Sequence, residues 1–441
     1  LPECNLLPGY SFYLLVCLIN RTVNVLYLLS QIKIVYLYKS GDVFLFCTKI
    51  TFMLIKREMY QEANESLKTF PILVITGARQ TGKTTLAKQL SDMPYFNLES
   101  PDIRELVSND PRLFLSRISE TGAIIDEFQR VPELASYLQV TADNIKKNGH
   151  FILTGSNNFL LMEKISQSLA GRAAILHLPP FTIREISSFN RSLSSDELMY
   201  RGFYPSIYSE KRQPTKAYNS YYQTYIERDV RQLINIKDLH LFQRFIRLCA
   251  GRTSQILNYE KLANETGTSA KTIKSWLAVL EASFLVFLLP PFSMNLKKRV
   301  VKSPKIYFYD TGLASYLLGI EEPAHIEYHP LRGALFENMV ISEHLKIRLN
   351  KGLPLNSYYY RDNHLNEVDL VIQSGNKLKL VEIKSSQTYH TSFADTLHWL
   401  YKQLKAYEVE KLVLYDGTEE WAKEGLTISN YKNYFLHSAN M

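Results

Sequence analysis

The segment PILVITGARQTGKTTLAKQL contains the residues with the clearest chemical signature. An apolar stretch, residues 72–76, leads into the spacing Gly-x-x-x-x-Gly-Lys-Thr, and residues with helical periodicity follow. This is the strand–loop–helix context of a Walker A motif, in which backbone N–H groups surround phosphates at a helix N-terminus. The loop predicts an ATP site formed by Gly77, Ala78, Arg79, Gln80, Thr81, Gly82, Lys83, Thr84 and Thr85.

Four side chains are expected to carry the chemistry at this site. Lys83 should reach the β- and γ-phosphates, and the Thr84 hydroxyl should ligate Mg²⁺. The later segment GAIIDEFQR predicts a buried strand that ends in Asp126 and Glu127. We expect Asp126 to hold Mg²⁺ through water and Glu127 to polarise the attacking water as a catalytic residue. The alternative is that these acids merely cap the next helix.

Three neighbouring segments complete the prediction of the nucleotide domain. YFNLES predicts a strand between the nucleotide strand and the Mg²⁺ strand, so these two are not expected to be adjacent. HFILTGSNN predicts a strand ending in Ser156 and Asn157, either of which could sense the γ-phosphate, with a plain turn as the alternative. Arg172 precedes another apolar strand, where it could act as an arginine finger in a neighbouring subunit or form a structural salt bridge.

The segments GARQTGKTTL, AIIDEFQRVPEL, ILTGSN and LAGRAAILHLPPFTIREI resemble the bacterial and archaeal AAA-type ATPases that carry a C-terminal domain of unknown function. The resemblance extends from about Met53 to the C-terminus. It implies a five-stranded parallel sheet and ATP binding. A homo-oligomer is a weaker implication of the same resemblance.

A second group of chemically suggestive residues lies near the C-terminus. Glu337 is on a predicted amphipathic helix, and Asp369 and Glu382-x-Lys384 are on two predicted strands that follow. This order resembles the PD-(D/E)xK nuclease core, in which carboxylates bind Mg²⁺ and the lysine orients water. Glu337, Asp369 and Glu382 are the predicted metal ligands, and Asp369, Glu382 and Lys384 the predicted catalytic residues. Exposed cross-strand ion pairs, or a fold without activity, are the alternatives.

The middle of the chain is basic. Residues 181–300 contain 18 Lys and Arg against 10 Asp and Glu, which accounts for the whole net charge of +8. LFQRFIRLCAG, NYEKLANETG and SAKTIKSWLAVLEAS have helical periodicity, and Gly267 separates the last two, as in a helix-turn-helix. The residues expected to face DNA are Lys271, Thr272, Lys274 and Ser275 on the third helix, and Lys297, Lys298 and Arg299 on a wing. A packing module that relays the ATP state is the alternative.

Residues 1–52 differ from the rest of the chain. They hold three of the four cysteines and six charges among apolar runs, and the run from Cys4 to Asn20 has nearly the length of a short membrane span. We expect this segment to be upstream sequence that precedes a native start at Met53, with a membrane or partner segment as the alternative. The cysteine content predicts no disulfide framework and fits a reducing, cytoplasmic setting.

Together these patterns predict an α/β protein in four parts. Residues 1–52 are the atypical segment, 53–185 a P-loop AAA-type parallel sheet with helices, 186–300 a basic helical linker and winged-helix-like segment, and 301–441 an α/β nuclease-like domain. The predicted function is ATP hydrolysis coupled to nucleic-acid engagement, with or without Mg²⁺-dependent cleavage. The alternative is an ATP-driven switch for protein partners whose C-terminal domain is catalytically silent.

Overall fold

The computed structural model describes residues 32–39, 42–49, 55–156, 167–190, 192–230, 238–293 and 303–437. The chain divides into two compact units, residues 1–55 and 56–441. In the first, β1 (Ile32–Lys39) and β2 (Asp42–Lys49) form an antiparallel hairpin. The run from Cys4 to Asn20 lies outside the described residues. No helix within the described ranges is long and apolar enough to span a membrane.

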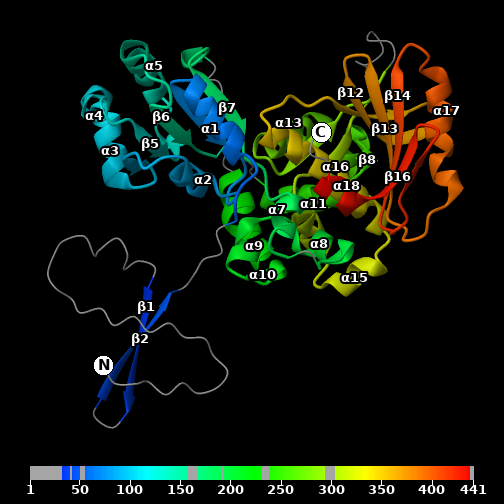
Figure 1. The fold of residues 1–441 in the computed structure, drawn as a ribbon, viewed down its shortest axis with the longest axis horizontal. Helices are drawn as coiled ribbons and strands as arrows, with labels where there is room; N and C mark the ends of the chain where they lie inside the picture. Colours follow the sequence, from blue (N-terminus) through cyan, green and yellow to red (C-terminus); the bar gives the residue numbers. More distant parts are fainter. Residues whose placement is uncertain are drawn as a thin grey trace. The chain divides into compact units, whose positions relative to one another are not determined.

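The N-terminal part of the second unit is a parallel sheet with helices on both faces (Figure 1). Its five strands run in the order β4-β5-β6-β3-β7. The strands are β3 (Ile72–Thr76), β4 (Tyr95–Asn97), β5 (Ala123–Asp126), β6 (Phe151–Thr154) and β7 (Ala173–His177). The helices are α1 (Tyr60–Thr69), α2 (Lys83–Leu90), α3 (Pro101–Asn109), α4 (Pro111–Arg117) and α5 (Leu134–Ile145). This is the parallel α/β sheet expected of a P-loop AAA fold.

The strand that separates β3 from β5 is β6. The prediction that the nucleotide strand β3 and the Mg²⁺ strand β5 are not adjacent is therefore confirmed. The strand expected to separate them was wrong, because YFNLES forms β4, which pairs with β5 at the sheet edge. All four residues of β6 are buried, whereas the three residues of β4 are half-buried. A central strand of a parallel sheet must bury both of its faces, and β6 has the sequence for that place.

Alternate residues of the central strands build the two cores of this sheet. Ile72 and Val74 of β3 pack with α4 and α5 on one face, and Leu73 and Ile75 pack with α1 and α2 on the other. Because side chains alternate across a strand, a continuous apolar run is required here. The run that ends at Thr76 is therefore buried on both sides just before the loop that begins at Gly77.

A helical region follows the sheet. Its helices are α7 (Ile183–Ser187), α8 (Ser195–Arg201), α9 (Pro205–Ser209), α10 (Pro214–Tyr221), a π-helical turn (Tyr222–Val230), α11 (Leu239–Ala250), α12 (Tyr259–Thr266) and α13 (Ala270–Ala282). Three antiparallel strands in the order β8-β10-β9 accompany them: β8 (Gln255–Ile256), β9 (Val286–Leu289) and β10 (Lys305–Phe308). Strand β10 lies beyond residue 300, so strand pairing joins the start of the predicted last domain to the middle one.

The predicted turn between α12 and α13 is confirmed. Gly267 ends α12 with φ of +88°, a left-handed conformation that favours glycine. The Ser269 side chain accepts a hydrogen bond from the Thr272 N–H at the start of α13, as expected of an N-cap. On the opposite side of α13, Ile273, Trp276, Leu277 and Leu280 are buried.

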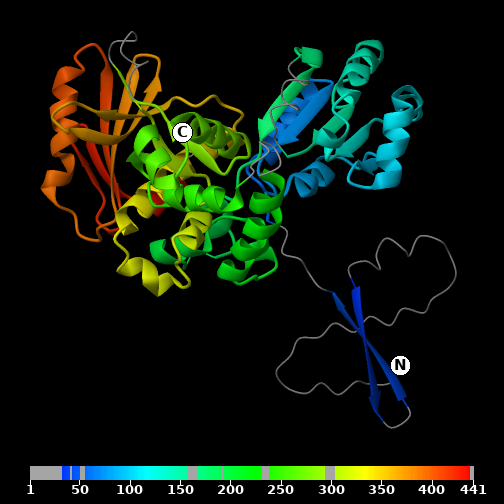
Figure 2. The same cartoon turned by 180° about the vertical axis from the view of Figure 1, so that it is seen from behind.

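The C-terminal part is a six-stranded mixed sheet in the order β11-β12-β13-β14-β16-β15. Its strands are β11 (Ser357–Arg361), β12 (Glu367–Ser374), β13 (Lys377–Lys384), β14 (Glu408–Tyr415), β15 (Trp421–Lys423) and β16 (Leu426–Asn430). The helices of this part are α14 (Thr311–Leu317), α15 (Pro323–Glu327), α16 (Arg332–Asn350), α17 (Asp395–Gln403) and α18 (Tyr431–His437). Seen from both sides, α16 and α17 lie on opposite faces of the sheet (Figures 1 and 2).

Candidate functional site

The loop between β3 and α2 is shaped by two glycines. Gly77 has φ of +146°, and a Cβ there would lie 2.3 Å from the backbone oxygen of Leu178. Gly82 has φ of +91° and precedes the first residue of α2. Both positions therefore exclude an ordinary side chain, and the loop passes close to the backbone after β7.

Lys83 lies over this loop. Its Nζ donates to the carbonyl oxygens of Ala78 at 2.8 Å and Gly77 at 3.2 Å. The side chain is buried, and burial lowers the pKa of the ammonium group to about 8, although Glu127 and Asp126 oppose that shift. A buried cation beside a ring of backbone groups is suited to bind an anion such as phosphate.

Asp126 is the centre of a cluster of hydroxyl groups. Its Oδ2 accepts hydrogen bonds from the Thr84 hydroxyl at 2.9 Å and the Tyr95 hydroxyl at 2.7 Å, and its Oδ1 accepts from Thr154. The predicted Mg²⁺ residues Thr84 and Asp126 are thus in direct contact. Their hydroxyl and carboxylate oxygens are the hard donors that Mg²⁺ prefers, so the residues fit that ion.

Tyr95 and Thr154 were not among the predicted site residues. Tyr95 begins β4 and Thr154 ends β6, and both strands flank β5. The sequence signal that could have found Thr154 is its place at the end of a strand, because the carboxyl ends of parallel strands share one edge of the sheet. Burial, and next its bond to Asp126, raise the pKa of the Tyr95 hydroxyl, which keeps it a hydrogen-bond donor.

Glu127 has an unusual backbone. Its φ of +55° lies in the left-handed region, which is uncommon for a residue with a side chain. Its N–H donates to Asp126 Oδ1 at 3.1 Å, and its carboxylate accepts a hydrogen bond from the Gln129 side chain. Backbone strain of this kind occurs at functional sites, where the surrounding structure holds it. The Gln129 contact orients the Glu127 carboxylate and was not predicted.

The structure does not bring Arg172 together with Lys83. Arg172 precedes β7, and its carbonyl oxygen accepts from the N–H of Ile72 at the start of β3, at the end of the sheet opposite the loop. Its guanidinium makes a two-bond ion pair with Asp143, with Nε–Oδ1 2.5 Å and Nη2–Oδ2 2.8 Å. This pair raises the pKa of Arg172. The other predicted residue of this group, Asn157, lies outside the described residues.

Asp369 on β12 and Glu382 on β13 are both buried, which excludes an exposed cross-strand ion pair. Asp369 Oδ2 accepts from the Ile383 N–H at 2.8 Å. Lys384 Nζ lies 2.5 Å from Glu382 Oε1. The three carboxylates repel one another. Burial and then Asp369 raise the pKa of Glu337 to about 7, and burial, then Asp369 and to a lesser extent Glu337 raise the pKa of Glu382 to about 8.

These carboxylates are not arranged as a ready-made metal site. Across the described residues, no three His, Cys, Asp or Glu side chains are grouped so that they could hold a metal ion. Two of the acids are paired with lysines instead, Glu382 with Lys384 and Glu337 with Lys305. The donor chemistry still suits a cation, because Glu382 Oε2 is buried and has no hydrogen-bond partner among the described residues.

Lys305 is the main residue here that the prediction missed. It lies on β10 and is 1% exposed, with Nζ 2.6 Å from Glu367 Oε1 and 3.0 Å from Glu337 Oε1. Burial alone would lower its pKa, but the surrounding carboxylates raise it. Tyr307, on the same face of β10, donates to Glu337 Oε1 at 2.6 Å. The alternation Lys-x-Tyr in KIYF was the available signal.

Comparison with protein families agrees with this architecture. The profile of the AAA domain matches residues 69–187, and two domains of unknown function, DUF8612 and DUF4143, match residues 193–324 and 332–434. An uncharacterized protein of Mycobacterium tuberculosis is 32% identical over 348 residues, which cover 77% of this chain and 76% of the relative. A protein of Mycobacterium bovis matches equally.

The chain belongs to this family of AAA-type P-loop ATPases. Among solved structures, a variant of Thermotoga maritima RuvB aligns with a TM-score of 0.27 and 17% identity, covering 53% of this ATPase and 88% of RuvB. Domain III of the replication initiation protein DnaA from the same organism aligns with a TM-score of 0.23 and 13% identity, covering 50% and 88%. Likenesses this weak say nothing about what the present ATPase binds.

The buried Lys305 gives a stability prediction. Lys305→Met should lower the free energy of unfolding by about 3–5 kcal/mol, because it leaves the largely buried Glu337 without its cation, whereas Glu367 keeps its ion pair with Arg361. The double variant Lys305→Met/Glu337→Gln should recover part of that loss, because it removes one uncompensated charge. Denaturant unfolding of the full chain measures both.

The matched control is Lys377→Met, which removes a lysine from an exposed pair with Glu408. It should change the free energy of unfolding by less than about 1 kcal/mol. Equal stability of Lys305→Met and the wild type would contradict the role of Lys305 as the buried counter-ion.

Proposed function

We propose that this chain hydrolyses ATP at the loop Gly77–Thr84 and couples the hydrolysis to the engagement of nucleic acid. The observation that carries the proposal is the contact of the Thr84 hydroxyl with Asp126 Oδ2 at 2.9 Å. Thr84 follows the phosphate-binding lysine, and Asp126 ends a separate strand. They meet where Mg²⁺ and the phosphates would have to lie.

Residues of the loop and of the neighbouring strand ends each have a separate role in the proposed hydrolysis. Lys83 binds the β- and γ-phosphates, with the backbone N–H groups of Gly77 to Thr85 around them. Magnesium held by Thr84 and Asp126 would neutralise phosphate charge. Glu127, oriented by Gln129, polarises the attacking water and takes its proton. Ser156 and Asn157 are the proposed γ-phosphate sensors.

Arg172 is proposed to act in a homo-oligomer. Because it lies at the opposite end of the sheet from its own Lys83, it can serve as an arginine finger in the site of a second copy and not in its own. Its ion pair with Asp143 would have to open for that role. Both partners are partly exposed, so the pair can exchange for another acceptor at small cost.

The ATPase proposal predicts distinct results for two variants. Lys83→Ala should abolish ATP binding, because the phosphate-binding cation is lost. Glu127→Gln should bind ATP as the wild type does and lower kcat by about 100-fold or more, as expected on loss of a general base. Equilibrium titration with ATP and steady-state phosphate release measure the two effects.

Two comparisons test whether the effects belong to Glu127 and Arg172 themselves. Glu133→Gln, at an exposed position before α5, should leave kcat unchanged. Arg172→Ala should lower kcat, whereas Asp143→Ala, which breaks the same ion pair, should not. A wild-type chain that neither binds nor hydrolyses ATP would overturn the proposal, and so would Glu127→Gln with an undiminished kcat.

The nucleic-acid part of the proposal is supported by the order of elements in the middle region. Helix α11, strand β8, helices α12 and α13, and strands β9 and β10 follow one another, and β10 pairs between β8 and β9. This is the layout of a helix-turn-helix with an attached sheet, in which the last helix enters the major groove. Of the four residues predicted to face DNA on α13, Lys271, Lys274 and Ser275 are exposed and Thr272 is half-buried. The wing residues Lys297, Lys298 and Arg299 lie outside the described residues.

DNA binding through α13 makes a prediction about salt dependence. The double variant Lys271→Ala/Lys274→Ala should weaken binding to a short duplex and lower the slope of log affinity against log salt by about 2, one for each phosphate contact. Fluorescence anisotropy between 50 and 200 mM salt, a range in which such contacts matter, measures the slope.

Lys402→Ala/Lys405→Ala is the matched control, because both lysines are exposed in the C-terminal domain. It should leave the slope as in the wild type. If the wild type itself does not bind DNA and its ATPase rate does not respond to DNA, the alternative of an ATP-driven switch for protein partners is favoured.

A second candidate function is metal-dependent cleavage of nucleic acid by the C-terminal domain. The unpartnered, buried Oε2 of Glu382 favours it, since mutual repulsion among Glu337, Asp369 and Glu382 is what a divalent cation would relieve. Lys384 would orient the attacking water. The absence of a preformed ligand group among the described residues favours the silent alternative.

This candidate predicts nicking of supercoiled DNA in Mg²⁺ or Mn²⁺. Asp369→Asn and Lys384→Ala should each lower the rate by about 100-fold or more, because each removes a group that acts on the reacting phosphate. Glu410→Gln, which alters an exposed acid on β14, is the control and should nick as the wild type does. Nicking that survives Asp369→Asn would exclude this site, and a wild type that does not nick would make the domain an interaction module.

A further inference from the structure

We propose that Arg57 is a positioning residue of the nucleotide site that holds the phosphate-binding loop to α7 and α16, so that nucleotide binding is coupled to α16. The inference rests on the proposed ATP site. It adds a residue from outside the loop, and it names the helix to which the loop is connected.

The guanidinium group of Arg57 joins three segments of the chain. It is 5% exposed and donates to the carbonyl oxygen of Thr81 at 2.5 Å, to that of Pro179 at 2.7 Å and to Glu185 Oε1 at 2.9 Å. Thr81 immediately precedes Gly82 and the phosphate-binding lysine. The planar fork of an arginine can make these three bonds at once, whereas a lysine has one ammonium group to place.

Glu185 is the buried acceptor that makes this arrangement rigid. Its Oε1 accepts from Arg57 and from the Glu58 N–H at 2.7 Å, and its Oε2 accepts from the Thr182 N–H at 2.9 Å. The last bond is half of a capping box at the start of α7. Both carboxylate oxygens of Glu185 accept hydrogen bonds. The Arg57–Glu185 pair is thus well defined, and through Arg57 it connects the loop to α7.

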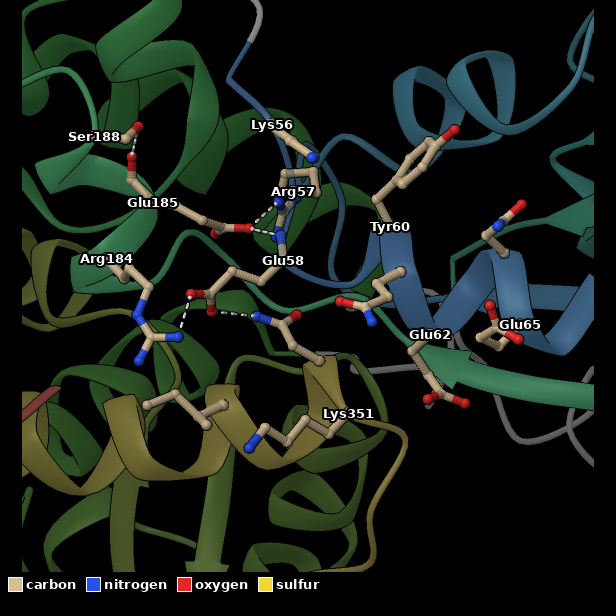
Figure 3. A pocket seen from close by; sticks show the side chains of 14 residues that line it. Lys56, Arg57, Glu58, Tyr60, Glu62, Glu65, Arg184, Glu185, Ser188 and Lys351 are labelled. Atoms are coloured by element: carbon tan, nitrogen blue, oxygen red, sulfur yellow. Dashed lines mark hydrogen bonds and ion pairs between the residues drawn. The ribbon is translucent and has the colours of Figure 1, made fainter. Parts of the chain in front are cut away.

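The contacts continue from α7 to α16. The Ile183 N–H donates to Glu343 Oε1 at 2.7 Å, and Lys346 Nζ donates to the carbonyl oxygen of Phe181 at 3.0 Å. Glu58 Oε1 lies 3.3 Å from Arg184, and the Asn350 amide donates to Glu58 Oε2 at 3.4 Å. Figure 3 shows the Glu185 carboxylate facing both Arg57 and the backbone of Glu58, and the Glu58 side chain reaching toward Arg184 beside the helix that ends before Lys351.

Helix α16 connects this network with the C-terminal carboxylates. Glu343 and Glu337 are six residues apart on one continuous helix, a rise of about 9 Å. Residues Leu335, Phe336 and Asn338 to Ile347 are buried, and close packing along this length opposes local bending of the helix. A displacement at its C-terminal end is therefore felt at Glu337.

A cavity of about 840 Å³ borders the network and is lined by residues that include Arg57, Glu58, Arg184 and Glu185. The side chains that line this cavity therefore have protein on some sides only, whereas the buried side chains of α16 are packed on all sides. The network therefore borders open space on this side. If nucleotide binding favours one position of α16, then by linkage a change that favours that position raises the affinity for nucleotide by the same factor.

The test combines kinetics with hydrogen exchange. Arg57→Lys keeps the charge beside Glu185 but cannot bond three segments. We expect it to raise the KM for ATP about tenfold, as loss of one charge-assisted hydrogen bond implies, and to change kcat by less than about twofold, since the loop is held equally in ground and transition states. In the wild type, Mg²⁺–AMP-PNP should slow amide exchange in residues 343–350, and at saturation this protection should be lost in Arg57→Lys.

Three comparisons keep the outcome clear. Arg212→Lys, in an exposed pair with Glu210, should leave the KM and the exchange pattern unchanged. If Arg57→Lys does not fold, the isosteric Glu185→Gln loosens Arg57 from α7 and should cause the same loss of protection. The inference is overturned if either folded variant retains both the KM and the protection. A wild type that does not bind ATP refutes the proposed function instead.

Discussion

The parallel order of the strands is the constraint on which the nucleotide site depends. With β6 between β3 and β5, three buried strands end at one edge of the sheet, and Thr84, Asp126 and Thr154 meet there although they are far apart in the chain. The edge strand β4 adds Tyr95 to the same carboxylate. No single motif creates this cluster. The meeting of Asp126 and Thr154, which end β5 and β6, follows from the rule that parallel strands present their carboxyl ends on one side.

Buried charge is the second theme of the molecule. In the C-terminal domain, two of the carboxylates that repel one another are paired with lysines, Glu337 with Lys305 and Glu382 with Lys384. At the nucleotide site, Lys83 is buried against carbonyl oxygens. In both places a lysine ammonium group is buried in a low-dielectric environment, where neighbouring charges have large effects on its pKa and on stability.

Helix α16 carries one residue of the C-terminal site and also contacts the segment that follows the nucleotide-binding sheet. Its first half carries Glu337, which contacts Lys305 and Tyr307 of the middle sheet. Its second half carries Glu343 and Lys346, which bond to the segment that follows β7. A single buried helix therefore meets all three parts of residues 56–441. This explains why strand pairing and helix packing make these residues one compact unit although three domain profiles divide them.

The sequence by itself determined the local features: the loop from Gly77 to Thr84, the strand ending at Asp126, and the turn at Gly267. These depend on spacing within a few residues, where backbone geometry and capping operate. Tertiary structure alone decided which strand separates β3 from β5, that Lys305 is the counter-ion of Glu337, and that Arg57 reaches Glu185. Such contacts join residues as many as 128 positions apart, and strand order and helix packing, which no local pattern encodes, bring them together.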